Sequence, residues 1–175
     1  VKVTFVINMI TNVTLTTKEK FLLEDQKSHE EICIKKYSEY ANLATDPELK
    51  NILNSNKKQE EEHLNSINQL LSGKVPSMSN SQGESNQSSN SSSGQNSGNL
   101  SHSPHLNVTS GSADKDICSD LLMTEKFVSG AYDTAIFEFK DPQVRDVLNH
   151  IQKEEQKHGE SIYKYMESKG MYNPK

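Results

Sequence analysis

The sequence is poor in the arginines that bind nucleic acid and in the cysteines that form disulfides. Among its 175 residues it has no Trp, two Cys and one Arg, Arg145. A net charge of −5 and a pI near 5.7 leave no basic surface that a phosphate backbone would attract. The two cysteines, Cys33 and Cys118, fall within helical apolar patterns, which is typical of buried, unpaired thiols. We therefore expect no nucleic acid partner and no redox motif.

Long hydrophobic runs are also missing. No segment approaches the roughly 18 apolar residues of a membrane span, and the first residues, VKVTFVINMI, are too interrupted for a secretion signal. We expect a soluble chain that has no membrane span and is not secreted by the usual route. Residues 1–14 are interpreted as a disordered N-terminal extension, with Met9 as an alternative start.

Apolar residues are too few for the whole chain to be folded. The hydrophobic share is 32% and the aromatic share is 6%, which is low for a domain that buries a full core. Between Ser77 and Gly111 the sequence consists mainly of Ser, Asn, Gln and Gly, and such a tract cannot bury enough surface to offset the entropy of ordering. Residues 74–113 are therefore predicted to be a disordered, low-complexity linker.

On each side of this linker the pattern predicts a helical hairpin, over residues 15–73 and 114–170. Apolar residues recur at helical spacing. Thr16 and Glu19 form a capping box, and an Asp-Pro pair begins the second helix of each hairpin. The predicted helices span residues 16–43, 46–71, 114–139 and 141–169.

An ungapped internal repeat relates the two hairpins. At an offset of 95 residues, Asp46 matches Asp141, and KQEEEHLNSI, from Lys58, matches KEEQKHGESI, from Lys153. Helices that are apolar along one stripe can bury these stripes in a four-helix bundle, so we predict an all-α fold. A linker with a reach of roughly 30–35 Å can cross a bundle whose helices are about 40 Å long, which lets the second and third helices run parallel.

Six ionisable side chains lie on the apolar stripes. Each hairpin has a Glu in its first helix and, 30 residues later, a Glu-x-x-His in its second, so the groups lie at matching heights. The residues are Glu30, Glu60 and His63 in the first hairpin and Glu125, Glu155 and His158 in the second. Burying them without partners would cost several kcal/mol each. The same ligand set binds two metal ions in ferritin-like di-iron and di-manganese proteins.

The sequence therefore predicts a centre for two Fe or Mn ions, since oxygen and imidazole ligands suit these metals. Glu60 and Glu155 would bridge the ions, and the other four residues would each bind one ion. An alternative stays open, in which the six groups pair among themselves or face solvent. Tyr37 and Tyr132 lie on the same stripes, where core packing is favoured over a role as partners of the glutamates. No catalytic residue and no organic cofactor is predicted.

Two long strings carry a family resemblance. LTTKEKFLLEDQKSHEEICIKKYSEYA and DKDICSDLLMTEKFVSGAYDTAIFEFKDPQVRDVLNHIQKEEQKHGESIYKYMESKGMY resemble the Coat F family of bacterial endospore coat proteins. The resemblance covers roughly residues 15–71 and 114–172. It implies a ferritin-like bundle in a Firmicutes-type spore former and assembly into the spore coat from the mother-cell cytoplasm. It also implies contacts with other coat proteins or with further copies of the chain.

Three functions agree with these features. The first is a spore coat protein whose ferritin-like bundle binds two Fe or Mn ions with little turnover. The second is an oxidoreductase that consumes peroxide or O2 as manganese catalase does. The lack of four clustered cysteines counts against a rubrerythrin-type peroxidase. The third is a metal-free structural interaction module, so the sequence leaves open whether the protein is an enzyme.

Overall fold

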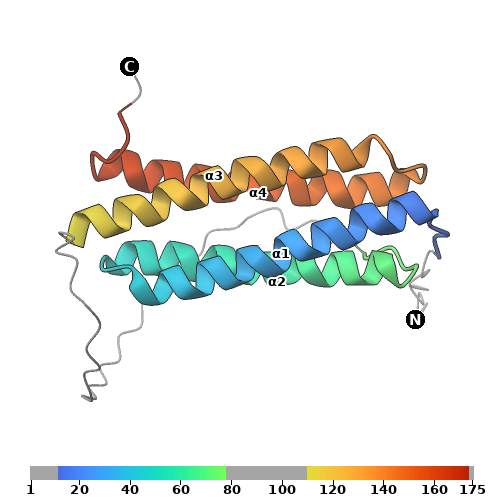
Figure 1. The fold of residues 1–175 in the computed structure, drawn as a ribbon, viewed down its shortest axis with the longest axis horizontal. Helices are drawn as coiled ribbons and strands as arrows, with labels where there is room; N and C mark the ends of the chain where they lie inside the picture. Colours follow the sequence, from blue (N-terminus) through green and yellow to red (C-terminus); the bar gives the residue numbers. More distant parts are fainter. Residues whose placement is uncertain (1–11, 78–109, 174–175) are drawn as a thin grey trace, which may run out of the picture.

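The computed structural model describes residues 12–77 and 110–173. Within these ranges it holds four helices and no sheet, which confirms the predicted all-α class (Figure 1). The helices are α1 (Thr17–Leu43), α2 (Pro47–Leu71), α3 (Ser110–Ile136) and α4 (Pro142–Ser168). The predicted linker falls largely on residues 78–109, which lie outside the described residues, as do residues 1–11 of the predicted N-terminal extension.

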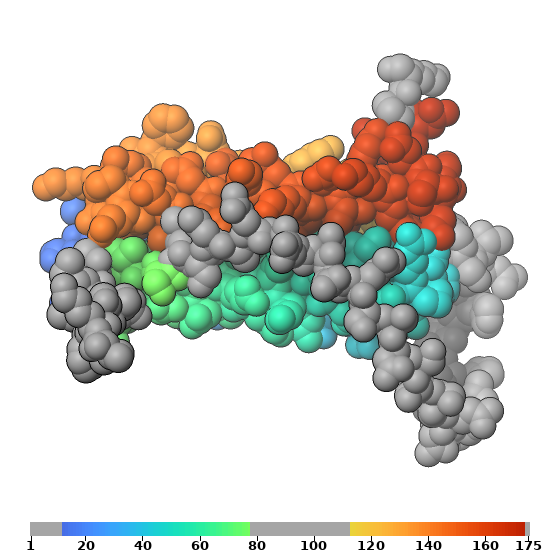
Figure 2. All heavy atoms as spheres, turned by 180° about the vertical axis from the view of Figure 1, so that it is seen from behind, coloured from blue at the N-terminus to red at the C-terminus, as the bar shows by residue number. Residues whose placement is uncertain are grey.

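The four helices lie side by side along one long axis (Figure 1). Helix α1 packs along α2 and α3 packs along α4, while the two hairpins meet through contacts of α1 with α3 and of α2 with α4. Figure 2 shows the face on which α4 lies along α2. Helices α2 and α3 run in the same direction, so the end of α2 and the start of α3 lie at opposite ends of the bundle (Figure 1).

Local sequence signals set three of the four helix starts. Thr16 and Glu19 form the predicted capping box, in which the Thr16 N–H donates to Glu19 Oε2 (2.7 Å) and the Glu19 N–H donates to Thr16 Oγ1 (3.2 Å). Asp46 and Asp141 each accept from a backbone N–H in the first turn of α2 or α4, at 2.8 Å, ahead of a Pro. These caps satisfy backbone groups that a helix start leaves unpaired.

Helix α3 departs from the prediction at both ends. It begins at Ser110, inside the predicted linker, and it ends at Ile136 rather than at residue 139. The early start shows that low helix propensity is a weak prior beside the packing of the turns that follow. The early end leaves room for the turn into Asp141 and Pro142, because the residue before a Pro disfavours helical backbone.

Each hairpin has a buried carboxylate that accepts hydrogen bonds from the loop of the other hairpin. Glu19 Oε1 accepts from the N–H of Lys140 (2.8 Å), and Asp114 accepts from the N–H (2.8 Å) and the hydroxyl (2.7 Å) of Thr45. Glu19 and Asp114 are equivalent in the repeat, and both are buried. Because each contact ties a helix of one hairpin to the loop of the other, the two contacts fix the relative height of the hairpins.

The residues just before α1 contact the end of α2. The Val13 N–H donates to the carbonyl of Gly73 (2.9 Å), and Asn12 and Lys74 form an isolated bridge. Gly73 has a φ of 79°, a conformation that side chains disfavour, so a glycine suits the turn that ends α2. Asn12 and Val13 therefore lie against the turn that ends α2.

The apolar core is interrupted midway along the helices by a polar layer. Along α1, for example, buried Leu23 precedes and buried Ala41 follows the polar Glu30. Cys33 and Cys118 are buried and unpaired, as predicted. No stretch of the four described helices has the length and hydropathy of a membrane span. What sets this bundle apart is therefore the chemistry of its middle layer.

Candidate metal centre

The polar layer contains all six ionisable residues that the sequence analysis singled out. Helix α1 contributes Glu30, α2 Glu60 and His63, α3 Glu125, and α4 Glu155 and His158. Each of the six is between 0% and 2% exposed. The apolar stripes bury these groups because each lies at the helical spacing of the core residues on its own helix.

The ligand atoms of these residues converge in two groups, and within each group they all lie within 4.8 Å of one another. The His63 position is formed by Glu30, Glu60, His63 and Glu155. The His158 position is formed by Glu60, Glu125, Glu155 and His158. Glu60 and Glu155 belong to both positions, and each position draws residues from both hairpins.

In both positions one imidazole nitrogen faces three carboxylates. His63 Nδ1 lies 3.0 Å from Glu155 Oε1 and 3.3 Å from Glu60 Oε2, with Glu30 Oε2 at 3.7 Å. His158 Nδ1 lies 3.1 Å from Glu60 Oε1, and its other two carboxylates are 3.7 and 3.9 Å away. A single N–H cannot satisfy three acceptors, whereas a cation between these atoms could contact all of them.

The outer nitrogen of each imidazole is held by an acceptor. His63 Nε2 lies 3.0 Å from Glu154 Oε2, and His158 Nε2 lies 3.0 Å from Gln59 Oε1. These oxygens only accept, so Nε2 keeps its hydrogen and, in the neutral ring, Nδ1 turns its lone pair to the glutamates. Metal-binding histidines are commonly oriented in this way.

Sequence reasoning missed Glu154 and Gln59. Each directly precedes a shared glutamate, and the two are equivalent in the repeat. That equivalence is a signal that could have found them. By contrast, Glu61 and Glu62 are exposed, as the sequence indicated.

Several carboxylate oxygens of the layer are buried without a hydrogen-bond partner. They are Glu30 Oε2, Glu125 Oε2 and both oxygens of Glu155. The contact between Glu155 Oε1 and His63 Nδ1 is short, at 3.0 Å, but it lacks the geometry of a hydrogen bond. A buried, uncompensated carboxylate costs several kcal/mol, so these oxygens fit the donor set of a bound cation.

Burial and hydrogen bonding shift the pKa values of the layer in opposite directions. Burial raises the pKa of Glu30 to about 7 and raises the pKa of Glu155 well above its ordinary value. Burial also acts to raise the pKa of Glu60, but hydrogen bonds with both histidines outweigh it and lower the pKa to about 2. Burial acts to lower the pKa values of His63 and His158, but the surrounding carboxylates raise them, to about 10 for His158. The layer thus favours positive charge, which protons or metal cations can supply.

Two tyrosines connect the glutamates of opposite hairpins. The Tyr37 hydroxyl of α1 donates to Glu125 Oε1 of α3, and the Tyr132 hydroxyl of α3 donates to Glu30 Oε1 of α1. Asn56 Nδ2 also donates to the Tyr37 hydroxyl (3.2 Å). The sequence favoured core packing for both tyrosines. They are fully buried, but each also orients a glutamate of the layer.

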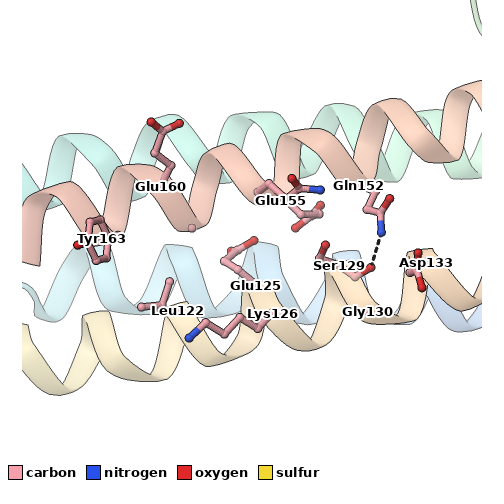
Figure 3. Close-up of a pocket in the computed structure, with 12 residues that line it drawn as sticks. Leu122, Glu125, Lys126, Ser129, Gly130, Asp133, Gln152, Glu155, Glu160 and Tyr163 are labelled. Atoms are coloured by element: carbon pink, nitrogen blue, oxygen red, sulfur yellow. Dashed lines mark hydrogen bonds between the residues drawn. The ribbon is translucent and has the colours of Figure 1, made fainter. Parts of the chain in front are cut away.

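A groove between α3 and α4 leads to the layer (Figure 3). Its volume is about 550 Å³, and its lining includes Glu125, Glu155, Gly130 and Gly159. Figure 3 shows the two glutamates between the helices that form the groove. The His158 position can therefore be approached from solvent.

The fold and the layer define an all-helical bundle protein with paired carboxylate and imidazole groups at its centre. The Coat F domain family matches residues 113–175, which include most of α3 and all of α4. This match confirms the resemblance to the Coat F family over the second hairpin. Comparisons with curated proteins and with solved structures found no match to the chain.

Proposed function

We propose that the protein is a spore coat component of a Firmicutes-type endospore former, and that its bundle is ferritin-like and holds two Fe or Mn ions. The Coat F match over residues 113–175 supports the coat assignment. The observation that carries the metal assignment is the set of buried carboxylate oxygens in the layer that have no hydrogen-bond partner. The orientation of both imidazoles by outer acceptors supports it further.

The charges of the layer fit two divalent cations. The four buried glutamates carry four negative charges when they are ionised, and the two imidazoles can be neutral. Two divalent ions would bring four positive charges, so the carboxylates would no longer need protons. Glu60 and Glu155 would bind both ions, and Glu30, His63, Glu125 and His158 would each bind one.

The donor types favour Fe or Mn over metals that prefer thiolates. Cys33 lies one turn from Glu30, but its thiol belongs to neither of the two groups of convergent ligand atoms. The remaining donors are carboxylate oxygens and imidazole nitrogens. When bound, such ions supply Lewis-acid and redox chemistry toward oxygen-containing molecules.

The second candidate function is an oxidoreductase of the manganese-catalase kind that consumes peroxide or O2. The groove between α3 and α4 favours it, because Glu125 and Glu155 line a space of about 550 Å³. A small molecule could use this space to approach the His158 position. The residues on either side would then orient that molecule and limit its contact with water.

Metal content and peroxide consumption separate these functions. The protein would be purified after growth with Fe and with Mn, and metal per chain would be measured by mass spectrometry. About two ions per chain without consumption supports the first function, and consumption supports the second. Fewer than about one ion per chain, unchanged in His63→Ala and His158→Ala, contradicts both and leaves a metal-free module. His29→Ala, which changes a histidine outside the layer, is the matched control.

The coat assignment has its own test. We propose assembly into the coat from the mother-cell cytoplasm, with other coat proteins and further copies of the chain as partners. A fluorescent fusion followed through sporulation should appear around the forming spore. A diffuse signal in the mother cell that never reaches the spore surface would contradict this assignment without bearing on the metal.

A further inference from the structure

The groove between α3 and α4 reaches two carboxylates with oxygens that have no hydrogen-bond partner. Glu155 is 0% exposed and accepts no hydrogen bond, and Glu125 is 2% exposed with Oε2 unpartnered. Both line the groove (Figure 3). A water molecule occupies roughly 30 Å³ of liquid, so a groove of about 550 Å³ has room for a cation with part of its hydration shell.

Glycine keeps the groove open. Gly159 and Gly130 have ordinary helical backbone, since the positive φ values in the described residues belong to other glycines. A Cβ at Gly159 would lie 3.7 Å from Leu122 Cδ1 and 3.9 Å from Glu125 Cβ, which are ordinary contacts. A glycine inside a helix costs about 1 kcal/mol relative to Ala. Neither the backbone conformation nor a close contact requires glycine at these two positions. What the glycines provide is the open space of the groove.

The first hairpin has larger side chains at the equivalent positions. Leu64 is the counterpart of Gly159, and Ile34 is the counterpart of Ser129, which also lines the groove. Both Leu64 and Ile34 are half-buried. The groove is therefore a feature of the second hairpin and not a requirement of the repeat.

The charges along the groove favour a cation. Asp133 is exposed at its edge, and the carboxylates of Glu125 and Glu155 lie at its inner end. Lys126 is also exposed at the edge. Glu160 lines the groove as well, but it is paired with Lys164 (2.5 Å), which does not line it. The carboxylate oxygens without hydrogen-bond partners thus lie at the inner end, where they can bind a cation.

A second groove, between α2 and α4, touches the layer from another side. Its lining includes His63 and Glu154. It faces the outer nitrogen of His63, which is hydrogen-bonded to Glu154, so the imidazole ring stands between this groove and the inward-facing ligand atoms.

We propose that the groove between α3 and α4 is the route by which a divalent cation enters and leaves the His158 position. This inference rests on the proposed metal centre. It predicts two classes of bound ion. The ion at the His158 position exchanges through the groove, and the ion at the His63 position is released more slowly.

Gly159→Leu tests this route by introducing the residue of the equivalent position. The protein would be loaded with Mn²⁺ and transferred to excess EDTA, and the metal remaining per chain would be measured over time. In the wild type a fast phase should account for half of the metal. In Gly159→Leu that phase should slow by about tenfold or more, while the metal bound at equilibrium stays the same because no ligand has changed.

Gly159→Ala is the matched control, since its Cβ makes only ordinary contacts and leaves most of the groove open. It should release metal as the wild type does. Gly130→Leu is a second variant, because an added Cβ there meets no atom within 4 Å. It fills the same groove if Gly159→Leu does not fold.

The release experiment tests the entry route and the metal centre separately. Wild-type release rates in a folded, fully loaded Gly159→Leu or Gly130→Leu overturn the groove as the route and leave the metal centre standing. A wild-type protein that binds no Mn²⁺ overturns the proposed function itself. Slowed release in the Leu variants but not in Gly159→Ala supports the route.

Discussion

The two hairpins match within the polar layer and differ around it. Each supplies one Glu from its first helix, one Glu-x-x-His from its second, and one Tyr that donates to the Glu of the other hairpin. Outside this set, Glu154 holds His63 whereas Gln59 holds His158. The repeated residues give two positions with the same ligand types. The unrepeated residues make those positions unequal in charge and in exposure to solvent.

This difference suggests a division of roles between the positions. A carboxylate that accepts from an imidazole makes it a stronger donor to a metal than an amide does. The His63 position, which Glu154 supports, should therefore bind more tightly. The His158 position, which Gln59 supports and the groove between α3 and α4 reaches, should bind more weakly and exchange faster.

The largest expected effect comes from removing a shared glutamate. Glu155→Gln takes a carboxylate from both positions, so metal content should fall from about two ions per chain to well below about one. Glu30→Gln affects only the His63 position and should leave about one ion. Metal analysis after dialysis measures both variants, with exposed Glu61→Gln as the control. Equal losses in the two variants would contradict the assignment of Glu155 to both positions and of Glu30 to one.

The second-largest effect should come from exchanging the outer acceptors, which should change the affinity of each position for metal. Glu154→Gln gives His63 the partner that His158 has, and it should weaken the His63 position by roughly 10- to 100-fold. Gln59→Glu is the matched converse and should strengthen the His158 position. Titration calorimetry with Mn²⁺ follows both. Unchanged affinities in the two variants would mean that the outer acceptors do not distinguish the positions.

Replacing the two tyrosines should reduce the stability of the protein by different amounts. The Tyr37 hydroxyl donates to Glu125 and accepts from Asn56, whereas the position equivalent to Asn56 in the second hairpin holds the apolar Ile151. Tyr37→Phe removes the donor to Glu125 and one of the two acceptors of Asn56, so it should cost about 2–3 kcal/mol, against about 1–2 kcal/mol for Tyr132→Phe. Urea unfolding of the metal-free protein measures both costs. Equal costs would show that Asn56 adds nothing to the first pair.

The smallest effect concerns a contact of Asp120 that its counterpart in the first hairpin does not make. Asp120 accepts from Lys36 and from the Tyr40 hydroxyl, both at 2.8 Å, whereas its counterpart Asp25 is exposed. Asp120→Asn should cost at most about 1 kcal/mol near neutral pH, and Asp25→Asn should cost nothing measurable. Thermal unfolding of both variants measures the difference. A larger loss in Asp25→Asn would reverse the comparison.

The pH dependence of this contact has a definite sign. Burial acts to raise the pKa of Asp120, but Lys36 and Tyr40 outweigh it, so the pKa lies below its ordinary value of 3.8. The stabilisation is therefore present above pH 3.8 and is lost as the pH falls through the lowered pKa. The difference between the wild type and Asp120→Asn should disappear over that range. A difference that grew on acidification would contradict the assignment.

Local signals predicted most of the fold. The capping box at Thr16 and the Asp-Pro pairs act within a few residues, and the apolar stripes follow helical spacing. Glu60 and His63 were found for the same reason, since their spacing and their copies at an offset of 95 residues are visible in the sequence. Whether these groups bind metal stays a prediction.

What the sequence did not predict depends on contacts between distant residues. The role of Tyr37 requires α1 and α3 to be antiparallel at one register, which brings it to Glu125. Glu154 contacts a histidine on another helix. The groove depends on the absence of a side chain at Gly159, which leaves no mark in a pattern of apolar residues. The start of α3 at Ser110 lies in a Ser- and Gly-containing segment that helix propensity does not favour.

Each position of the layer contains residues of both hairpins, and this has a consequence for the order of folding. Each hairpin can form from contacts close in sequence, which is fast, whereas the layer needs residues as distant as Glu30 and Glu155 to meet. The layer should therefore form only in the final step, when the hairpins dock. A cation that binds the docked layer would slow undocking more than it speeds folding. The supply of metal would then set how long a folded molecule lasts.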